Sequence, residues 1–109
     1  MKKGELWVSE FKSGNGREQK GIRPAMIIAD TKTDLIIVVP LTSNLDSLTK
    51  LPFTIKIESS INNNLETDSV ALLFQIRTLD KKRLIHKIGT LEQNYINQIN
   101  TQLKVLLKL

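Results

Sequence analysis

Short apolar runs separated by polar segments make up most of the chain as far as Thr90. Residues 5–11 alternate roughly between apolar and polar positions and are rich in β-forming side chains, which predicts a strand. Residues 23–29 and 35–39 are almost wholly apolar, so both are expected to be core strands. The second should be covered on both faces, by a barrel interior and a partner subunit, and should end at Pro40. Further strands are expected at 53–58, 69–74 and 85–89, a bent continuation at 75–79, and polar loops at 44–51 and 59–68.

The C-terminal segment changes to a helical period. Apolar residues recur there at helical spacing and define a buried stripe made of Ile96, Ile99, Leu103 and Leu106. Thr90, with Gln93 three residues later, fits a capping box and predicts where this helix begins. Asp80 is expected to cap one earlier helical turn over residues 80–84. The whole pattern favours a mainly β fold: a small, curved, partly open antiparallel barrel with one C-terminal helix across an open end or face.

The stretch from Glu18 to Pro24 closes a long charged loop, residues 12–22, onto the second strand. Long charged loops in compact domains tend to carry function. Gly21 can adopt a positive φ, and Pro24 fixes its own φ and pushes Arg23 towards an extended conformation. Arg23 is therefore expected to be a rigidly held guanidinium at the mouth of a core strand, where it suits a phosphate group.

Composition narrows the possible classes. The 109 residues are enough for one domain, residues 1–109, and the absence of cysteine excludes disulfides, thiolate metal sites and a cysteine nucleophile. The net charge of +5 is compatible with a nucleic-acid partner, or with solubility alone. There is no long apolar run and no signal-peptide pattern, so we expect a cytoplasmic protein that does not enter a membrane.

Several kinds of catalytic site are not indicated. The sequence has one histidine, His86, no metal-binding motif and no cluster of acidic residues, so no metal and no cofactor are predicted. His86 stands in a basic stretch and is expected to be a plain surface or packing residue. Glu66 and Asp68 flank a loop beside an asparagine run, and their expected role is turn chemistry.

Arg23 and Arg77 both stand next to apolar strand segments, and an arginine so close to a core must be paired or must face a pocket. Arg23 could simply pair with Glu10, Glu18 or Asp80 and hold the loop. Thr42, just past the third strand, would by itself be a hydroxyl that caps backbone groups. Two arginines and a hydroxyl around one mouth would instead suit a phosphorus transition state, because arginine keeps its proton and stabilises negative charge.

Six motifs in this order resemble the MazF/PemK-type toxins of bacterial toxin–antitoxin systems. They are Gly4-Glu5-Leu6-Trp7, Glu18-Gln19-x-Gly21-x-Arg23-Pro24, Pro40-Leu41-Thr42-Ser43, Asp68-Ser69-Val70, Gln75-Ile76-Arg77-Thr78-Leu79-Asp80 and Lys87-Ile88-Gly89-Thr90-Leu91. The resemblance covers nearly the whole chain. It implies an SH3-like barrel with a C-terminal helix, a homodimer, and a metal-independent endoribonuclease that cuts single-stranded mRNA at short motifs.

The resemblance also implies the site residues. The family's essential pair corresponds to Arg23 and Thr42, and Glu18 corresponds to a further position that affects activity. We expect RNA contacts from six more residues, namely Gln19, Lys20, Ser43, Gln75, Arg77 and Asp80. The segment 12–17 lacks the family's common proline-rich start, which should alter sequence preference first.

RNA carries its own nucleophile, the 2′-hydroxyl, so the expected products are a 2′,3′-cyclic phosphate and a 5′-hydroxyl. Glu18 is the first candidate for the general base and His86 the second. Expected partners are RNA, a second copy of the chain and a cognate antitoxin. Two alternatives stay open: a non-catalytic toxin of the same fold that inhibits DNA gyrase, and a module that only binds RNA or acts as a repressor with its antitoxin.

Overall fold

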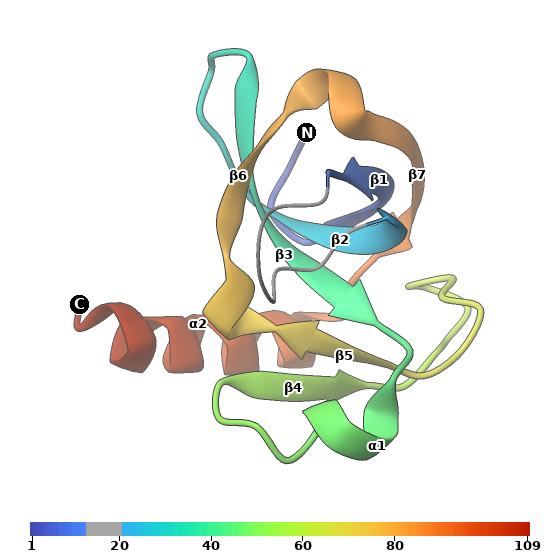
Figure 1. Cartoon of the computed structure of the whole chain (residues 1–109), viewed down its shortest axis with the longest axis vertical. Coiled ribbons are helices and arrows are strands. Elements are labelled where there is room, and N and C mark those ends of the chain that lie inside the picture. Colours follow the sequence, from blue (N-terminus) through green and yellow to red (C-terminus); the bar gives the residue numbers. More distant parts are fainter. Residues whose placement is uncertain (13–20) are drawn as a thin grey trace.

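A computed structural model of the chain describes residues 1–12 and 21–109 (Figure 1). Its centre is a seven-stranded antiparallel sheet in the order β4-β5-β3-β2-β1-β7, with β6 also paired to β3. The strands are β1 (Glu5–Phe11), β2 (Gly21–Asp30), β3 (Leu35–Thr42), β4 (Thr54–Ile57), β5 (Ser69–Leu72), β6 (Arg77–Asp80) and β7 (Leu84–Thr90). The helical segments are α1 (Leu45–Leu48), η1 (Leu73–Gln75), η2 (Lys81–Arg83) and α2 (Gln93–Leu107). The predicted mainly β, partly open architecture with one C-terminal helix is confirmed.

The strand β3 continues past the position where it was expected to end. Pro40 pairs with Ala25 of β2, and the strand runs on to Thr42. On its other side β3 pairs with β6 up to Val38 and with β5 only from Leu41 onward. Pro40 therefore lies where β3 passes from one neighbour to the next, a place where the missing N–H of a proline is tolerated. The prediction that Pro40 ends the strand was wrong.

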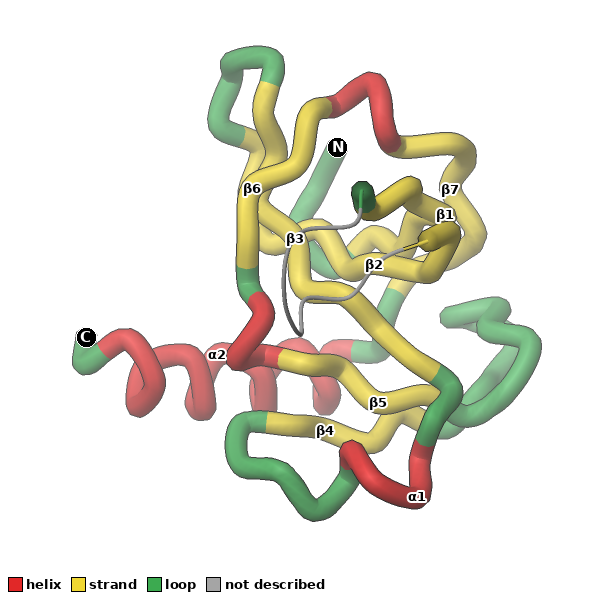
Figure 2. The backbone as a smooth tube through the Cα atoms, viewed as in Figure 1, coloured by secondary structure: helices red, strands yellow, loops and turns green. Residues whose placement is uncertain are grey.

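Two hydrophobic clusters cover the opposite faces of β3. Ile36 and Val38 pack in one cluster with Phe11, while Val39 and Leu41 pack in the other. Successive strand residues point to opposite faces, so a continuous apolar run fits a strand covered on both sides. Residues of this same chain supply cover on both faces of β3. Figure 2 shows how the sheet curls.

The segments after β3 differ in detail from the sequence pattern. The expected loop 44–51 contains the single helical turn α1. The fifth strand ends at Leu72, and η1 separates it from β6, which is the bent continuation expected there. The Asp80 carboxylate accepts a hydrogen bond from the backbone N–H of Lys82 at 2.9 Å, which confirms the predicted cap of η2.

The helix α2 contributes Ile96, Ile99 and Leu103 to the larger core cluster, as its spacing predicted. Its expected cap was wrong, because the residue before the helix is Glu92 and no side chain caps the first turn. Thr90 instead ends β7, opposite Glu5. Within the described ranges, no helix is both long and apolar enough to cross a membrane.

Candidate functional site

The β2–β3 hairpin brings Arg23 and Thr42 together. Ala25 pairs with Pro40, so Arg23, two residues before Ala25, lies opposite Thr42, two residues after Pro40. Residues two apart on a strand share a face, and both side chains therefore project the same way. Arg23 Nη1 donates a hydrogen bond to Thr42 Oγ1 at 3.3 Å. Two residues that are 19 positions apart in sequence thus form one pair at the end of the hairpin.

The backbone around Arg23 has the features expected from the sequence. Gly21 has a φ of +92°, in the left-handed region that glycine adopts without strain, and β2 begins at this residue. Arg23 does not take the acidic partners proposed for it on β1 and β6. Glu10 pairs with Arg83 at 3.2 Å, and Asp80 caps η2. Glu18, the third proposed partner, lies outside the described residues.

The hydroxyl of Thr42 is nearly buried, with 4% of the residue exposed. Its oxygen accepts from Arg23 and also from the backbone N–H of Asn44 at 3.2 Å. A hydroxyl oxygen has two lone pairs and one proton. Both lone pairs are engaged by these two donors, so the proton is the part of the group left for a ligand. Thr42 is set up as a hydrogen-bond donor.

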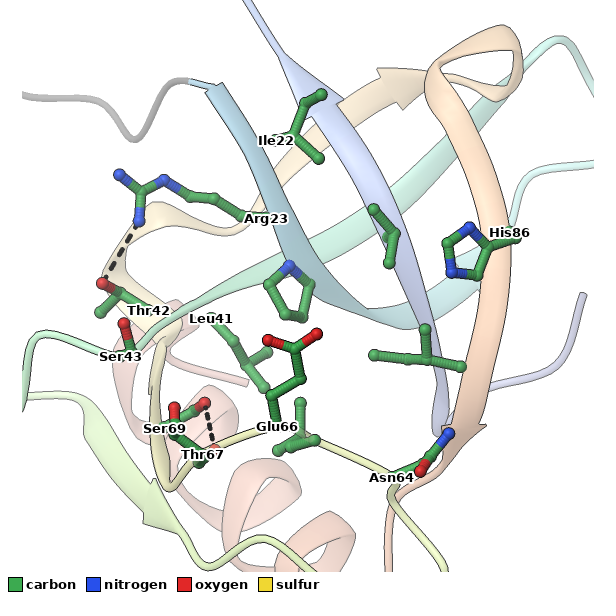
Figure 3. A pocket seen from close by; sticks show the side chains of 14 residues that line it. Ile22, Arg23, Leu41, Thr42, Ser43, Asn64, Glu66, Thr67, Ser69 and His86 are labelled. Atoms are coloured by element: carbon green, nitrogen blue, oxygen red, sulfur yellow. Dashed lines mark hydrogen bonds between the residues drawn. The ribbon is translucent and has the colours of Figure 1, made fainter.

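A cavity of about 670 Å³ opens beside this pair (Figure 3). Its walls come from β1, β2, β3 and β7 and from the loop that precedes β5. The apolar wall residues include Val8, Pro24, Leu41 and Ile88, and the polar ones include Arg23, Thr42, Ser43, Glu66, Ser69 and His86. The Arg23–Thr42 pair lies at one side of the cavity and His86 at the other. The space is large enough for more than a phosphate group and suits a nucleotide-sized ligand.

The expected RNA-contact residues that the structure describes do not all lie together. Ser43 lines the cavity, while Gln19 and Lys20 lie outside the described residues. Gln75 and Arg77 line a second hollow of about 390 Å³, together with Phe74.

Arg77 of β6 also contacts the ring of Phe11, at the end of β1. Its guanidinium carbon lies 5.3 Å from the centre of the Phe11 ring, close enough for a cation–π contact. Asp80 caps η2 and is not among the described residues that line the main cavity. The expected RNA contacts of Gln75, Arg77 and Asp80 stay predictions.

The sequence predicted turn or surface roles for Asp68, Glu66 and His86. The Asp68 carboxylate accepts from the backbone N–H of Ser59 at 2.9 Å, as expected of turn chemistry. Glu66, however, projects from the same loop into the cavity (Figure 3). His86 is an exposed surface residue, as expected, and it also lines the cavity. The sequence held no signal for Glu66, because its place depends on the pairing of Val70 in β5 with Thr42 in β3.

Among the described residues, no three histidine, aspartate or glutamate side chains lie close enough together to hold a metal ion.

Residues 2–107 match the family described as the PemK-like, MazF-like toxins of type II toxin–antitoxin systems. The chain belongs to this toxin family. A curated relative, named endoribonuclease MazF, from Staphylococcus saprophyticus subsp. saprophyticus, is 34% identical, and the alignment covers 100% of this chain and 92% of the relative. The family expected from the six sequence motifs is confirmed, and the relative's name agrees with the expected enzyme class.

Solved structures of the family share the fold. MazF from Deinococcus radiodurans superposes with a TM-score of 0.81 at 24% identity, over 98% of this chain and 96% of that one. A mycobacterial endoribonuclease, solved in complex with its cognate antitoxin, superposes with a TM-score of 0.73 at 21% identity. That alignment covers 98% of this chain and 94% of the mycobacterial one. The fold of these two solved structures therefore matches almost the whole of this chain.

Proposed function

We propose that this chain is the toxin of a toxin–antitoxin pair and acts as an endoribonuclease on single-stranded mRNA, cutting at short sequence motifs. Family membership and the name of the curated relative support the enzyme class. The observation that carries the proposal is the hydrogen-bonded Arg23–Thr42 pair on the wall of one nucleotide-sized cavity. A guanidinium and a hydroxyl donor in one hollow fit the charge that develops on a phosphodiester.

In the proposed reaction, the 2′-oxygen attacks the adjacent phosphorus in line with the 5′-oxygen. The bond from O2′ to phosphorus forms, and the bond from phosphorus to O5′ breaks. The 2′-hydroxyl proton goes to a general base, and the departing 5′-oxygen takes up a proton. The products are a 2′,3′-cyclic phosphate and a 5′-hydroxyl, so neither a metal-bound water nor an enzyme nucleophile is needed.

Arg23 and Thr42 have separate tasks in this reaction. Arg23 stays protonated at any working pH and stabilises the additional negative charge on the phosphoryl oxygens. Its 3.3 Å bond to Thr42 lies at the long end of the hydrogen-bond range. Thr42 donates its proton to a phosphoryl oxygen. It does not serve as the base, because both of its lone pairs are engaged.

Glu18 is the first candidate for the general base and His86 the second. His86 lies across the cavity from the Arg23–Thr42 pair. Replacing the true base should remove the acidic limb of the pH profile of kcat/KM, whereas replacing the other residue should leave the shape of the profile intact. Glu18→Gln and His86→Ala, measured side by side, distinguish the two.

The nuclease is tested with pure protein, a long defined RNA and EDTA. The wild type should give discrete cuts with 2′,3′-cyclic phosphate and 5′-hydroxyl ends, and the same RNA with 2′-deoxy residues at the cut sites should stay intact. Thr42→Val keeps the shape of the side chain but removes the donor, and should lower kcat/KM about 10²- to 10³-fold, as loss of one transition-state donor does. Thr42→Ser keeps the donor and should stay within about tenfold of the wild type. Intact RNA with a protein that still arrests growth would overturn the nuclease and favour a target such as DNA gyrase.

The same proposal includes two protein partners. A cognate antitoxin is expected for a toxin of a type II system, and an acidic tail would complement the net charge of +5. A second copy of the chain is expected at α2 and at η1, which contacts this helix; Val105 and Leu107 of α2 and Phe74 of η1 are exposed apolar residues there. Phe74→Glu should therefore raise the dimer dissociation constant measured by sedimentation. A protein that stays monomeric at all concentrations would refute the dimer. We place the toxin in the cytoplasm, where its mRNA substrate is.

A further inference from the structure

The carboxylate of Glu66 stands inside a cavity that otherwise suits an anion. Glu66 lies in the loop before β5, and its side chain points towards the middle of the cavity, between the Arg23–Thr42 pair and His86 (Figure 3). Among the described residues, this carboxylate accepts no hydrogen bond and forms no ion pair, although Arg23 lines the same space. Glu66 is exposed to solvent at this cavity, so its carboxylate is solvated there, and within the described part of the chain it is fixed neither by a loop contact nor by an ion pair with Arg23.

An ionised carboxylate only accepts hydrogen bonds. A phosphate group offers it no donor and repels it, so the RNA backbone alone would be bound more weakly because Glu66 is there. The donors that RNA does carry are the 2′-hydroxyl and the N–H groups of the bases. Arg23 and Thr42 hold the phosphate and its ribose at one side of the cavity. The part of a bound nucleotide that extends towards Glu66 is then the base.

The walls near Glu66 suit a base as well. Val8, Pro24 and Ile88 give the cavity apolar surface, and His86 adds a flat ring on which a splayed base can stack. An apolar wall with one aimed polar group is the usual construction of a selective pocket, since the wall binds any base and the polar group chooses among them.

We propose that Glu66 is a specificity-determining residue, which accepts a hydrogen bond from the exocyclic amino group of one base of the cleavage motif and thereby rejects uracil. This inference rests on RNA being the substrate. Adenine, cytosine and guanine each carry such an amino group, whereas uracil presents carbonyl oxygens in its place, and these repel a carboxylate. A good side-chain contact to a base edge discriminates against the wrong base by roughly 5- to 150-fold. One position of the motif should therefore be depleted of uracil by a factor in that range.

The test begins with the cleavage motif of the wild type, read from a randomised RNA pool. Short RNAs are then made in which the base at the uracil-depleted position either keeps or lacks its amino group, with purine replacing adenine, hypoxanthine replacing guanine, or 2-pyrimidinone replacing cytosine. The wild type should cut the RNA that lacks the amino group at least about fivefold more slowly. The set also includes the RNA with uracil at this position, which the wild type should cut more slowly still. Glu66→Gln should nearly abolish the preference over uracil, because an amide can turn its N–H₂ group towards a uracil carbonyl. The matched control is Glu58→Gln, the same chemical change at an exposed residue that does not line the cavity.

Binding separates a failure of this inference from a failure of the proposed function. The same RNAs, made uncleavable by 2′-O-methyl groups, are titrated against the wild type and Glu66→Gln. If no RNA is cut but the Glu66-dependent preference appears in binding, the nuclease is wrong and Glu66 still reads a base. If RNA is cut but Glu66→Gln keeps the full preference, or slows every RNA equally with an unchanged motif, the specificity role is refuted.

Discussion

The side chain of Asn63 holds the loop that carries Glu66 through hydrogen bonds. Replacing Asn63 with aspartate tests how much these bonds contribute to the free energy of unfolding. Asn63 is fully buried. Its Nδ2 group donates to the backbone carbonyl of Glu58 at 2.9 Å and to the Glu92 carboxylate at 3.1 Å. Its Oδ1 atom accepts from the backbone N–H groups of Ser60 and Leu65 at 2.9 and 3.1 Å. Asn63→Asp keeps the shape and both acceptor bonds but removes both donor bonds.

The expected loss can be added up from these contacts. The Glu58 carbonyl loses its donor at a part-buried site, which costs about 1–3 kcal/mol. The bond to the charged Glu92 is worth about 1.5–3 kcal/mol, and a second carboxylate now faces it. Glu92 is only half-buried and can turn towards water, which relieves part of the repulsion. We expect the free energy of unfolding at pH 7 to fall by about 3–5 kcal/mol in Asn63→Asp.

Urea unfolding followed by tryptophan fluorescence measures this change, since the chain has a single tryptophan, Trp7. Asn62→Asp is the matched control: its side chain is exposed, so it should lose less than about 0.5 kcal/mol. The difference between the two variants should shrink as the pH falls, because protonation of the introduced carboxyl restores a donor and removes the repulsion. A loss below about 1 kcal/mol for Asn63→Asp would refute the assigned hydrogen-bond network.

Two further predictions concern stability. In Gly89→Ala, the added Cβ would lie 2.5 Å from the backbone oxygen of Asn63, and we expect this overpacking to cost about 1–3 kcal/mol. The melting temperature should fall by about 4–8 °C for each kcal/mol lost. An unchanged melting temperature would contradict the close approach. The hydrogen bond from Lys81 Nζ, helped by the backbone N–H of Lys32, lowers the pKa of Asp30 from 3.8 to about 2. A lowered carboxyl pKa contributes stability above the unfolded value, and this contribution is lost as the pH falls from about 3.8 to about 2. Asp30→Asn should be less stable at pH 7 and should lose less stability than the wild type across that window in acid titrations; equal slopes would refute the assignment.

Much of the fold could be predicted from local pattern. The apolar runs gave the core strands, Asp80 gave a cap, and the stripe on α2 gave its buried face. These features depend on neighbours within one turn or one strand, where side-chain period and backbone preference act directly. The errors fell where tertiary pairing overrides local preference. Pro40 stays in β3 because β3 changes neighbours there, and Thr90 stays in β7 because it pairs with Glu5.

The site shows the same division. Sequence alone marked Arg23 and Thr42 through the motifs around them, and it fixed the extended backbone at Arg23 through Pro24. Glu66 was missed because its sequence neighbourhood is that of an ordinary turn. Its position in the cavity follows from the pairing of β5 with β3, a contact between segments almost thirty residues apart, as between Thr42 and Val70. No local pattern reports such a contact.

The decisive feature of the tertiary structure is the register between β2 and β3. Near the turn, Asp30 pairs with Ile36 and Ala29 with Ile37, and continuing that register would put Ser43 opposite Arg23. A bulge between Ile27 and Ala29 shifts the pairing by one residue, so that Ile27 pairs with Val38 and Thr42 comes to lie opposite Arg23. A shift of one residue turns every side chain to the other face of a strand, and nothing in the apolar run 25–29 marks where the extra residue falls. The sequence thus determined which residues could bind a phosphodiester, and only the packed sheet decided which hydroxyl meets the arginine.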